Sequence, residues 1–452
     1  LRLILTGTAG TGETVAIREM VRRIGESRFL LLAPTGNAAC AIGGQTLHRG
    51  LSIPLASRAR RASADPSDLS PTILQDLQRR LREVDFILVD EFSMIPQALL
   101  VLMIIRGKQA GSFGGLNLIL VGDPQQLPSV GVASVWNPDP QNGGHSVEGY
   151  HVWTHLTAAV ELTEVRRQEG DDQAVFRQVL SRVAEGCVRQ EDWQVLLPAM
   201  RSGRTVKEKS TVDDAVHIYP TNAQADFWNW EQLQSLRTPI ARIDAEHTVS
   251  GFTSASTERF RGRAPALFLA VGARVFINNN LWTAAGLANG AVGHVLHMHW
   301  ADGRRPPQLP DVVFVRLEHF RGEQQYFTEM DVNIGGSSVS LRNTVPIVPI
   351  EATDENPPAA NRRGNRAPGE TFPARCVRRQ LPLTLAFGIT IHKSQGQSMT
   401  RAVIDIGRAE RPDGLSFTAL SRVRSLGGLL LDDVDCDRLL AINNSSSFEL
   451  RL

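Results

Sequence analysis

The stretch that decides the fold is Gly7-Thr8-Ala9-Gly10-Thr11-Gly12-Glu13-Thr14. It follows the apolar run Leu3-Ile4-Leu5 and precedes a segment from Ile17 to Ile24 whose apolar residues recur at helical spacing. A glycine-rich turn between a strand and a helix lets backbone N–H groups surround phosphate oxygens at the positive end of the helix. The spacing is that of the phosphate loop GxxxxGK[ST], so it predicts nucleotide binding by all eight residues. Taken alone, a chance glycine-rich turn is the alternative.

One position departs from this pattern, because Glu13 stands where the loop requires lysine. The lysine would donate charge-assisted hydrogen bonds to the phosphates, worth about 1.5–3 kcal/mol. Glutamate removes them and places a like charge beside the triphosphate. We therefore hypothesise that the chain hydrolyses ATP poorly. The next residue, Thr14, keeps the hydroxyl that would ligate Mg²⁺.

Polar residues follow two further apolar runs. Asp90 and Glu91 come directly after Phe86 to Val89, where Asp90 would hold Mg²⁺ through water and Glu91 would orient the attacking water. Gln126 follows the run from Leu116 to Val121 and could contact both the γ-phosphate and that water. The alternatives are a helix cap for the acidic pair and an ordinary polar turn residue for the glutamine.

Apolar runs that alternate with helical segments predict an α/β fold, with parallel strands covered on both faces. Ligands of such sheets bind beyond the carboxyl ends of the strands, which is where these polar residues fall. Residues 52–70, which are rich in arginine, serine and proline, interrupt the alternation and predict an inserted arm. From about 255 to 380 the pattern changes to short strands and turns, which predicts a small β domain. Within it, 354–379 predicts a mobile loop rich in arginine and proline.

Composition restricts the class of protein. The 452 residues are 42% hydrophobic and 21% charged, with a net charge of +1, so we expect a globular chain that concentrates any basic surface locally. The four cysteines form no CxxC pair, which argues against a zinc ribbon or a disulfide scaffold. We find no leader and no membrane-spanning run, and therefore expect a soluble intracellular protein. A strand that begins at Leu1 suggests a chain clipped at its N-terminus.

Further motifs occur in a fixed order along the chain. They are Ala33-Pro34-Thr35-Gly36-Asn37-Ala38-Ala39, Gly44-Gln45-Thr46-Leu47-His48, Gly122-Asp123-Pro124-Gln125-Gln126-Leu127-Pro128, Val165-Arg166-Arg167-Gln168, Pro220-Thr221-Asn222, Val271-Gly272-Ala273-Arg274-Val275, Leu287-Ala288-Asn289-Gly290, Thr390-Ile391-His392-Lys393-Ser394-Gln395-Gly396 and Ala419-Leu420-Ser421-Arg422-Val423-Arg424. Together with the phosphate loop and Asp90, this series resembles the superfamily-one helicases of the PIF-one and RecD-like branch. The resemblance covers about residues 3–435.

The resemblance implies two RecA-like P-loop NTPase domains with parallel sheets, and a small inserted β-barrel. We place the first at 1–160 with the arm at 52–70, the second at 161–254 and 380–452, and the barrel at 255–379. It also implies ATP and Mg²⁺ as cofactors, single-stranded and forked DNA as partners, 5′→3′ movement and a monomeric motor. Repair, recombination and telomere maintenance in the nucleus, or else the mitochondrion, are the implied roles.

The resemblance also implies roles for individual residues. Arg167 and Arg422 would reach the nucleotide and complete a catalytic set with Glu91 and Gln126, while Asp90 joins Thr14 at the metal. The DNA-facing positions are Pro34, His48, His392, Lys393, Ser394 and Gln395. Arg49 joins them because a motor needs sequence-blind contacts to phosphate. Trp228, Trp230 and Phe387 could stack on bases, but we expect them in the core.

Three departures qualify this picture. Glu13 replaces lysine, Asn37 stands where the family usually has lysine, and no adenine-reading glutamine segment precedes the first strand. The leading interpretation is an ATP-dependent DNA helicase. The alternative is a catalytically impaired, helicase-like scaffold that binds DNA, which Glu13 favours. A small-molecule kinase would not need the second arginine-bearing domain.

Overall fold

The computed structural model describes residues 1–52, 71–97, 100, 116–129, 134–137, 144–200, 215–248, 257–260, 262–279, 281–282, 285–287, 290–301, 303–318, 320, 322, 331–334, 337–341, 343–354, 376–432 and 434–444. The chain divides into two compact units, one formed by 1–226 with 388–452 and the other by 227–387. The arginines of the predicted arm and most of the predicted arginine- and proline-rich loop lie outside the described residues.

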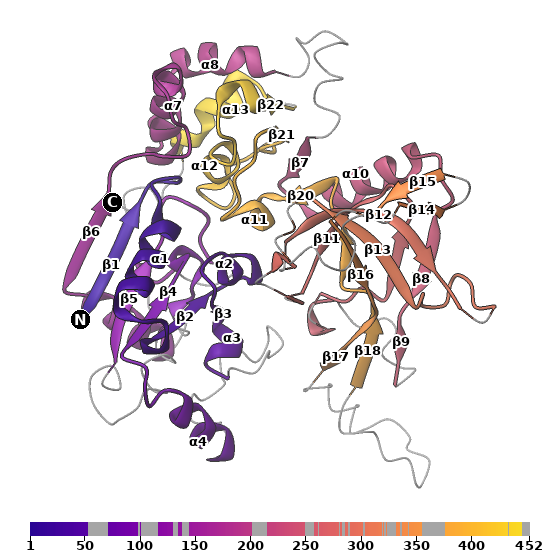
Figure 1. Ribbon diagram of the computed structural model, residues 1–452. Helices are drawn as coiled ribbons and strands as arrows, with labels where there is room; N and C mark the ends of the chain where they lie inside the picture. The colour runs from indigo at the N-terminus through magenta and orange to yellow at the C-terminus, as the bar shows by residue number, and fades with distance from the viewer. Residues whose placement is uncertain are drawn as a thin grey trace, which may run out of the picture. The chain divides into compact units, whose positions relative to one another are not determined.

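The first unit alternates strands and helices (Figure 1). Its elements are β1 (Arg2–Gly7), α1 (Glu13–Ile24), β2 (Phe29–Ala33), α2 (Gly36–Ala41), β3 (Gln45–Thr46), α3 (Leu47–Gly50), α4 (Pro71–Arg80), β4 (Phe86–Val89), β5 (Asn117–Val121), α6 (Gly144–Thr154), β6 (Ala158–Leu162), α7 (Ala174–Glu185), α8 (Gln190–Leu196), β7 (Val216–Tyr219), β20 (Gly388–Thr390), α11 (Ile391–Ser394), β21 (Ala402–Ile404), α12 (Leu415–Leu420), β22 (Leu429–Leu431) and α13 (Cys436–Leu440).

The larger sheet of this unit has six strands in the order β3-β2-β4-β5-β1-β6, and neighbouring strands pair in parallel. Successive residues of a strand point to opposite faces, so neighbouring side chains enter different cores. In β2, Leu31 packs with Ile17 of α1, whereas Leu32 packs with Leu77 of α4. Helices therefore cover both faces, as the continuous apolar runs predict.

A second parallel sheet follows the order β20-β7-β21-β22. The helix α7 ends before Gly186, which adopts the left-handed conformation (φ 67°) that closes such a helix. Both sheets thus have the all-parallel arrangement expected from the sequence. Among the described residues, no helix combines the length and the hydrophobicity needed to cross a membrane.

The second unit is rich in β-structure. Its elements are α10 (Asn222–Ser235, begun in the first unit), β8 (Ala241–Asp244), β9 (Glu246–His247), β10 (Ala266–Leu269), β11 (Arg274–Ile277), β12 (Val292–His299), β13 (Val312–Leu317), β14 (Asp331–Ile334), β15 (Ser337–Ser340), β16 (Thr344–Ile347), β17 (Ile350–Asp354), β18 (Cys376–Gln380) and β19 (Leu383–Leu385). Five strands pair antiparallel in the order β16-β13-β12-β11-β19. Closure into a barrel, and the three domain boundaries given above, stay predictions.

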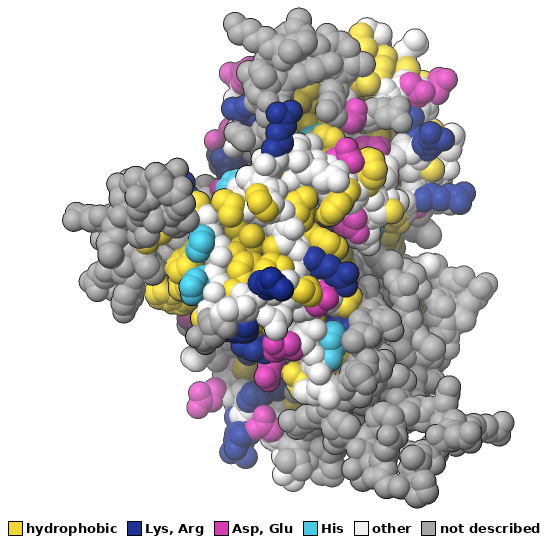
Figure 2. All heavy atoms as spheres, turned by 90° about the vertical axis from the view of Figure 1, so that its right-hand side faces the viewer, with side chains coloured by type: hydrophobic (Ala, Val, Ile, Leu, Met, Phe, Trp, Pro, Cys, Tyr) yellow, Lys and Arg dark blue, Asp and Glu magenta, His cyan; other side chains and the backbone are white. Residues whose placement is uncertain are grey.

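Aromatic residues of the second unit are partly at its surface. Figure 2 shows hydrophobic side chains gathered on the face turned to the viewer, with histidines beside them. Trp230 is 39% exposed and meets the exposed Phe268 edge to face, with ring centroids 5.5 Å apart. The expectation of a core position for Trp230 was therefore wrong. Phe387 packs partly buried against the core of the unit.

The core of the larger sheet should be sensitive to lost volume. Leu88 in β4 has no exposed surface, and Leu88→Ala is expected to lower the free energy of unfolding by about 2–5 kcal/mol, because buried contacts are lost and a cavity remains. Chemical denaturation of the two proteins measures this difference. The control is Leu197→Ala, since Leu197 is 46% exposed. Equal losses for both substitutions would contradict the assignment of Leu88 to the core.

Candidate nucleotide site and nucleic-acid interface

The glycine-rich loop lies between β1 and α1, and two of its glycines stand where a larger side chain would be disfavoured. Gly12 caps α1 in the left-handed region (φ 97°), where L side chains are disfavoured. The Gly10 carbonyl accepts hydrogen bonds from the backbone N–H groups of Arg166 and Arg167, at 2.8 and 3.1 Å. A Cβ at Gly10 would lie 2.6 Å from that of Arg167. The loop is therefore held against the Val165 to Gln168 motif.

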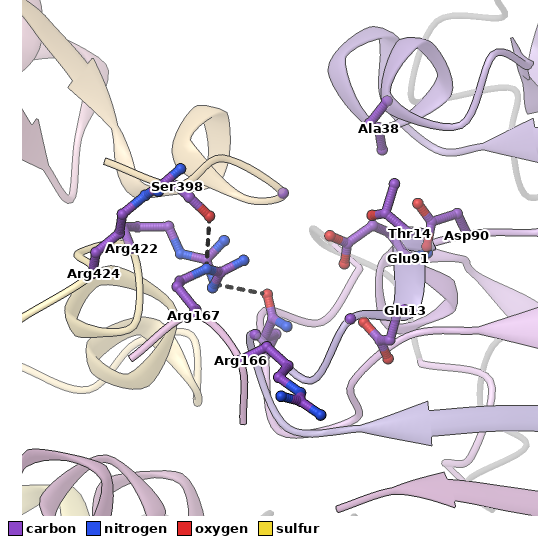
Figure 3. A pocket seen from close by; sticks show the side chains of 15 residues that line it. Glu13, Thr14, Ala38, Asp90, Glu91, Arg166, Arg167, Ser398, Arg422 and Arg424 are labelled. Carbon is purple, nitrogen blue, oxygen red and sulfur yellow. Dashed lines mark hydrogen bonds between the residues drawn. The ribbon is translucent and has the colours of Figure 1, made fainter. Parts of the chain in front are cut away.

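The predicted nucleotide residues surround one cavity of about 290 Å³ in the first unit. Its lining is Gly10, Gly12, Glu13, Thr14, Ala38, Ala41, Asp90, Glu91, Gln126, Arg166, Arg167, Gly396, Ser398, Arg422 and Arg424. Figure 3 shows the acidic side chains and Thr14 on one side of this cavity and the four arginines on the other. The structure thus brings together every predicted catalytic and metal residue, together with part of the predicted loop.

The acidic pair follows β4 and is turned inward. Asp90 and Glu91 are 6% and 8% exposed, and the Glu91 backbone N–H donates to Asp90 Oδ1 at 3.0 Å. Burial, followed by the charge of Glu91, raises the pKa of Asp90. Glu91 has a left-handed backbone (φ 55°), which is uncommon for a residue other than glycine and recurs at functional sites.

Glu13 is the residue of this site that departs from the phosphate-loop pattern. Its Oε1 lies away from solvent and has no hydrogen-bond partner among the described residues. Burial raises the pKa of Glu13, and the neighbouring carboxylates of Glu91, Asp123 and Asp90 raise it further, while Arg167 opposes them. A lysine at this position would turn three repulsions into attractions. The local electrostatics therefore suit the lysine of the phosphate loop and oppose the glutamate.

Gln126 links the acidic side of the cavity to the arginines. Its Nε2 donates to Asp123 Oδ2 at 3.2 Å, and its Oε1 accepts from the Arg422 guanidinium at 3.3 Å. Burial raises the pKa of Asp123 to about 7, partly offset by the N–H donors of Gln125 and Gln126. A side chain held between a carboxylate and an arginine is placed to respond when charge enters the cavity.

The two predicted arginines are held by backbone and hydroxyl oxygens. Arg167 donates to Ser398 Oγ at 2.7 Å and to the Ser421 carbonyl at 3.0 Å. Arg422 is 1% exposed and donates to the Thr418 carbonyl at 2.7 Å. Burial, followed by the charge of Arg167, lowers the pKa of Arg422 to about 9. Two guanidiniums that repel each other in a buried site would be stabilised by an anion.

Sequence reasoning missed several residues of the site. Arg166 and Arg424 line the cavity, and each lies one or two positions from a predicted arginine, which was the available signal. Gln168 is fully buried and donates to the carbonyl of Val423 at 2.7 Å, so it braces the segment that carries Arg422. The sequence gives no distinct signal for a buried glutamine of this kind.

The donor set fits Mg²⁺ and phosphate in part. Thr14 and Asp90 supply oxygen ligands, and the arginines supply donors for phosphate. Within the described ranges, no group of three or more His, Cys, Asp or Glu side chains could hold a metal on its own. Mg²⁺ commonly takes one or two carboxylates and completes its shell with water and substrate phosphate, so this set remains suitable.

The predicted DNA-facing residues differ in exposure. Pro34, His48 and His392 are half-buried, whereas Arg49 and Lys393 are exposed. Burial lowers the pKa of His392. The side chains of the last two residues in the predicted His392 to Gln395 set are turned inward. Ser394 Oγ donates to the carbonyl of Ile391 at 2.8 Å, and Gln395 Nε2 donates to Glu91 Oε2 at 2.8 Å. A DNA role for the set stays a prediction.

Comparison with known proteins shows which proteins this chain resembles. The profile of the PIF1-like helicases matches residues 2–194. The ATP-dependent DNA helicase Pif1 of Bdellovibrio bacteriovorus is 26% identical over 95% of this chain and 83% of its own length. The human ATP-dependent DNA helicase PIF1 is 29% identical over 96% of this chain and 58% of its own length. The chain is thus similar to the PIF1-like helicases.

Solved structures of Pif1 helicases share the fold. The Candida albicans enzyme superposes with a TM-score of 0.71 at 24% identity, covering 97% of this chain and 92% of that one. A Bacteroides Pif1 helicase in complex with ADP-AlF₃ and ssDNA gives 0.69 at 23% identity, covering 97% and 90%. The predicted α/β class with two RecA-like domains is confirmed. The chain spans 53–59% of the length of several eukaryotic relatives.

The buried carboxyl of Asp123 should make stability depend on pH. In an unfolded chain its pKa is about 3.9, and in the folded protein it is about 7. The folded state therefore binds the proton more tightly, so this contribution to stability is complete below about pH 4 and is lost as the pH rises through 7. Asp123→Asn is expected to reduce that loss by on the order of 4 kcal/mol.

Denaturant unfolding at a series of pH values between 4 and 8 measures the effect. The control is Asp226→Asn, which removes an acidic residue from the surface. An unfolding free energy that falls with pH as steeply in Asp123→Asn as in the parent protein would show that Asp123 is not the group responsible.

Proposed function

We propose that the chain is an ATP-dependent DNA helicase that moves 5′→3′ along single-stranded DNA. The observation that carries this is the single cavity in which Thr14, Asp90, Glu91, Gln126 and the arginines converge. Acidic groups and a hydroxyl suit the metal and the attacking water, and the arginines suit the charge that develops on phosphate. The family relatives named as ATP-dependent DNA helicases support the same activity.

DNA is the proposed partner, in single-stranded and forked form. Solved relatives are described as bound to ssDNA or as unwinding forked dsDNA. In this chain the exposed Arg49 and Lys393 and the half-buried His392 are the groups through which we expect phosphate contacts. Repair, recombination and telomere maintenance are the roles that the resemblance to PIF1-like helicases suggests. Action on DNA supports the nucleus as compartment, with the mitochondrion second.

Glu13 motivates the second candidate, a DNA-binding scaffold that turns over little ATP. The raised pKa of Glu13 and its unpartnered oxygen favour that reading locally. The comparisons give it no support, because the relatives are named as ATP-dependent helicases. Catalytic groups other than the lysine are all present around the cavity. We therefore retain the helicase as the function and treat Glu13 as a modulation of its rate.

The deciding experiment is ATP hydrolysis with and without single-stranded DNA, for the chain as it stands and for Glu13→Lys. We expect DNA-stimulated hydrolysis in both, with kcat/KM raised roughly 10- to 100-fold in Glu13→Lys, because lysine restores hydrogen bonds to phosphate worth about 1.5–3 kcal/mol. Glu91→Gln in each background is the control and should abolish turnover. Absence of hydrolysis in both proteins, with DNA binding intact, would favour the scaffold.

The exposed Lys393 allows a separate test of the DNA interface. Lys393→Ala is expected to weaken binding to oligothymidylate and to reduce the slope of log K against log salt concentration by about 0.7, because one phosphate contact is lost. Fluorescence anisotropy across a salt series measures both quantities. Arg22→Ala, whose side chain is 69% exposed on α1, is the matched loss of one cation. The same change of slope in both variants would remove Lys393 from the interface.

A further inference from the structure

One hydrogen bond joins the predicted DNA-facing segment to the predicted catalytic carboxylate. Gln395 Nε2 donates to Glu91 Oε2 at 2.8 Å across 304 positions of sequence. Both side chains are buried, at 4% and 8% exposure. In the described part of the chain, Gln395 is the only residue that hydrogen-bonds to the Glu91 carboxylate. The contact is therefore the direct link between that carboxylate and the 390–396 segment.

The segment that carries Gln395 is internally braced. Thr390 Oγ1 accepts from the Lys393 backbone N–H at 3.4 Å, Ser394 Oγ donates to the Ile391 carbonyl, and Gln397 Nε2 donates to the Lys393 carbonyl at 3.0 Å. Gln395 follows the last residue of α11 directly. These bonds hold the short helix and the residues that follow it together. A displacement of α11 should therefore move Gln395 as well.

The backbone of Glu91, which accepts this hydrogen bond through its side chain, is also constrained. Glu91 holds a left-handed backbone conformation beside Gly122, where a Cβ would lie 3.2 Å from the Glu91 Cα. The backbone therefore has little freedom, and the carboxylate can be redirected mainly by what it bonds to. Gln395 contributes a neutral donor, so a change in this contact moves the carboxylate without altering the charge of the cavity.

We propose that Gln395 is a positioning residue that transmits occupancy of α11 by DNA to the Glu91 carboxylate, which orients the attacking water. This inference rests on the proposed function. Phosphate contacts at His392 and Lys393 shift α11, Gln395 moves with it, and Glu91 follows through the shared hydrogen bond. The inward side chain of Gln395 thus serves DNA-dependent hydrolysis and contributes little to DNA affinity.

The experiment compares the parent with Gln395→Ala, which removes the donor, and Gln395→Met, which keeps the approximate length of the side chain and its neutrality but loses the N–H. Each is made also in the Glu13→Lys background. We expect the stimulation of ATP hydrolysis by DNA to fall about tenfold, and the loss to persist at DNA concentrations that saturate binding. Gln397→Ala is the control, because Gln397 bonds to the same segment but does not contact Glu91.

A second readout does not depend on catalysis. Hydrogen exchange of the backbone amides in residues 86–95 is measured with and without saturating oligothymidylate. We expect DNA to change the exchange of this segment in the parent and in Gln397→Ala, and to leave it unchanged in Gln395→Ala. If the parent protein does not bind oligothymidylate at all, the proposed function is contradicted. This outcome is distinct from a failure of the inference about Gln395, in which DNA binds normally.

Three results would overturn the inference. The first is a parent protein that binds DNA with no change in exchange at 86–95. The second is a Gln395→Ala variant that keeps both the exchange response and the stimulation of the parent. The third is a tenfold loss of DNA affinity in Gln395→Ala with full stimulation at saturating DNA, which would make Gln395 an ordinary DNA contact.

Discussion

The cavity depends on a balance of charge that is held out of water. Removing ionised groups from solvent is costly unless they are paired, and here carboxylates face guanidiniums across a small space. The balance is incomplete on both sides, because burial and like charges raise the pKa of Asp90 and Asp123 and lower that of Arg422. An anionic ligand with a divalent cation would relieve both repulsions, so the site is electrostatically suited to a metal–nucleotide complex.

Because of this charge distribution, the charge of residue 13 should have a large effect on the cavity. In most surface positions a lysine-to-glutamate difference would have a small effect, since solvent screens both charges. Here the side chain shares its surroundings with Glu91, Asp123 and Asp90, and its Oε1 is enclosed. If the cavity binds nucleotide as proposed, the sign of the charge at this position should determine how well it accepts phosphate. The remaining catalytic groups do not depend on Glu13 for their own hydrogen bonds among the described residues.

A few hydrogen bonds of high sequence separation join distant segments within the first unit. The Gly10 carbonyl binds the backbone of Arg166 and Arg167, Arg167 binds the Ser421 carbonyl, and Gln395 binds Glu91. Each of these joins a loop at the end of one parallel sheet to a segment elsewhere in the chain. The proposed motor function requires such links, because nucleotide and DNA must affect each other through differential contacts in two states.

The sequence by itself determined the alternation of strands and helices, the phosphate loop and the acidic pair, because these depend on local periodicity and on contiguous motifs. It also allowed the convergence of Asp90 and Gln126 to be predicted, since the carboxyl ends of parallel strands meet at one edge. Only the tertiary structure decided that Arg166 and Arg424 line the cavity, that Trp230 is exposed and that Gln395 turns inward to Glu91. Those outcomes depend on which distant segments pack together. The direction of each side chain is set by contacts with residues far away in the sequence, and local sequence patterns do not identify those residues.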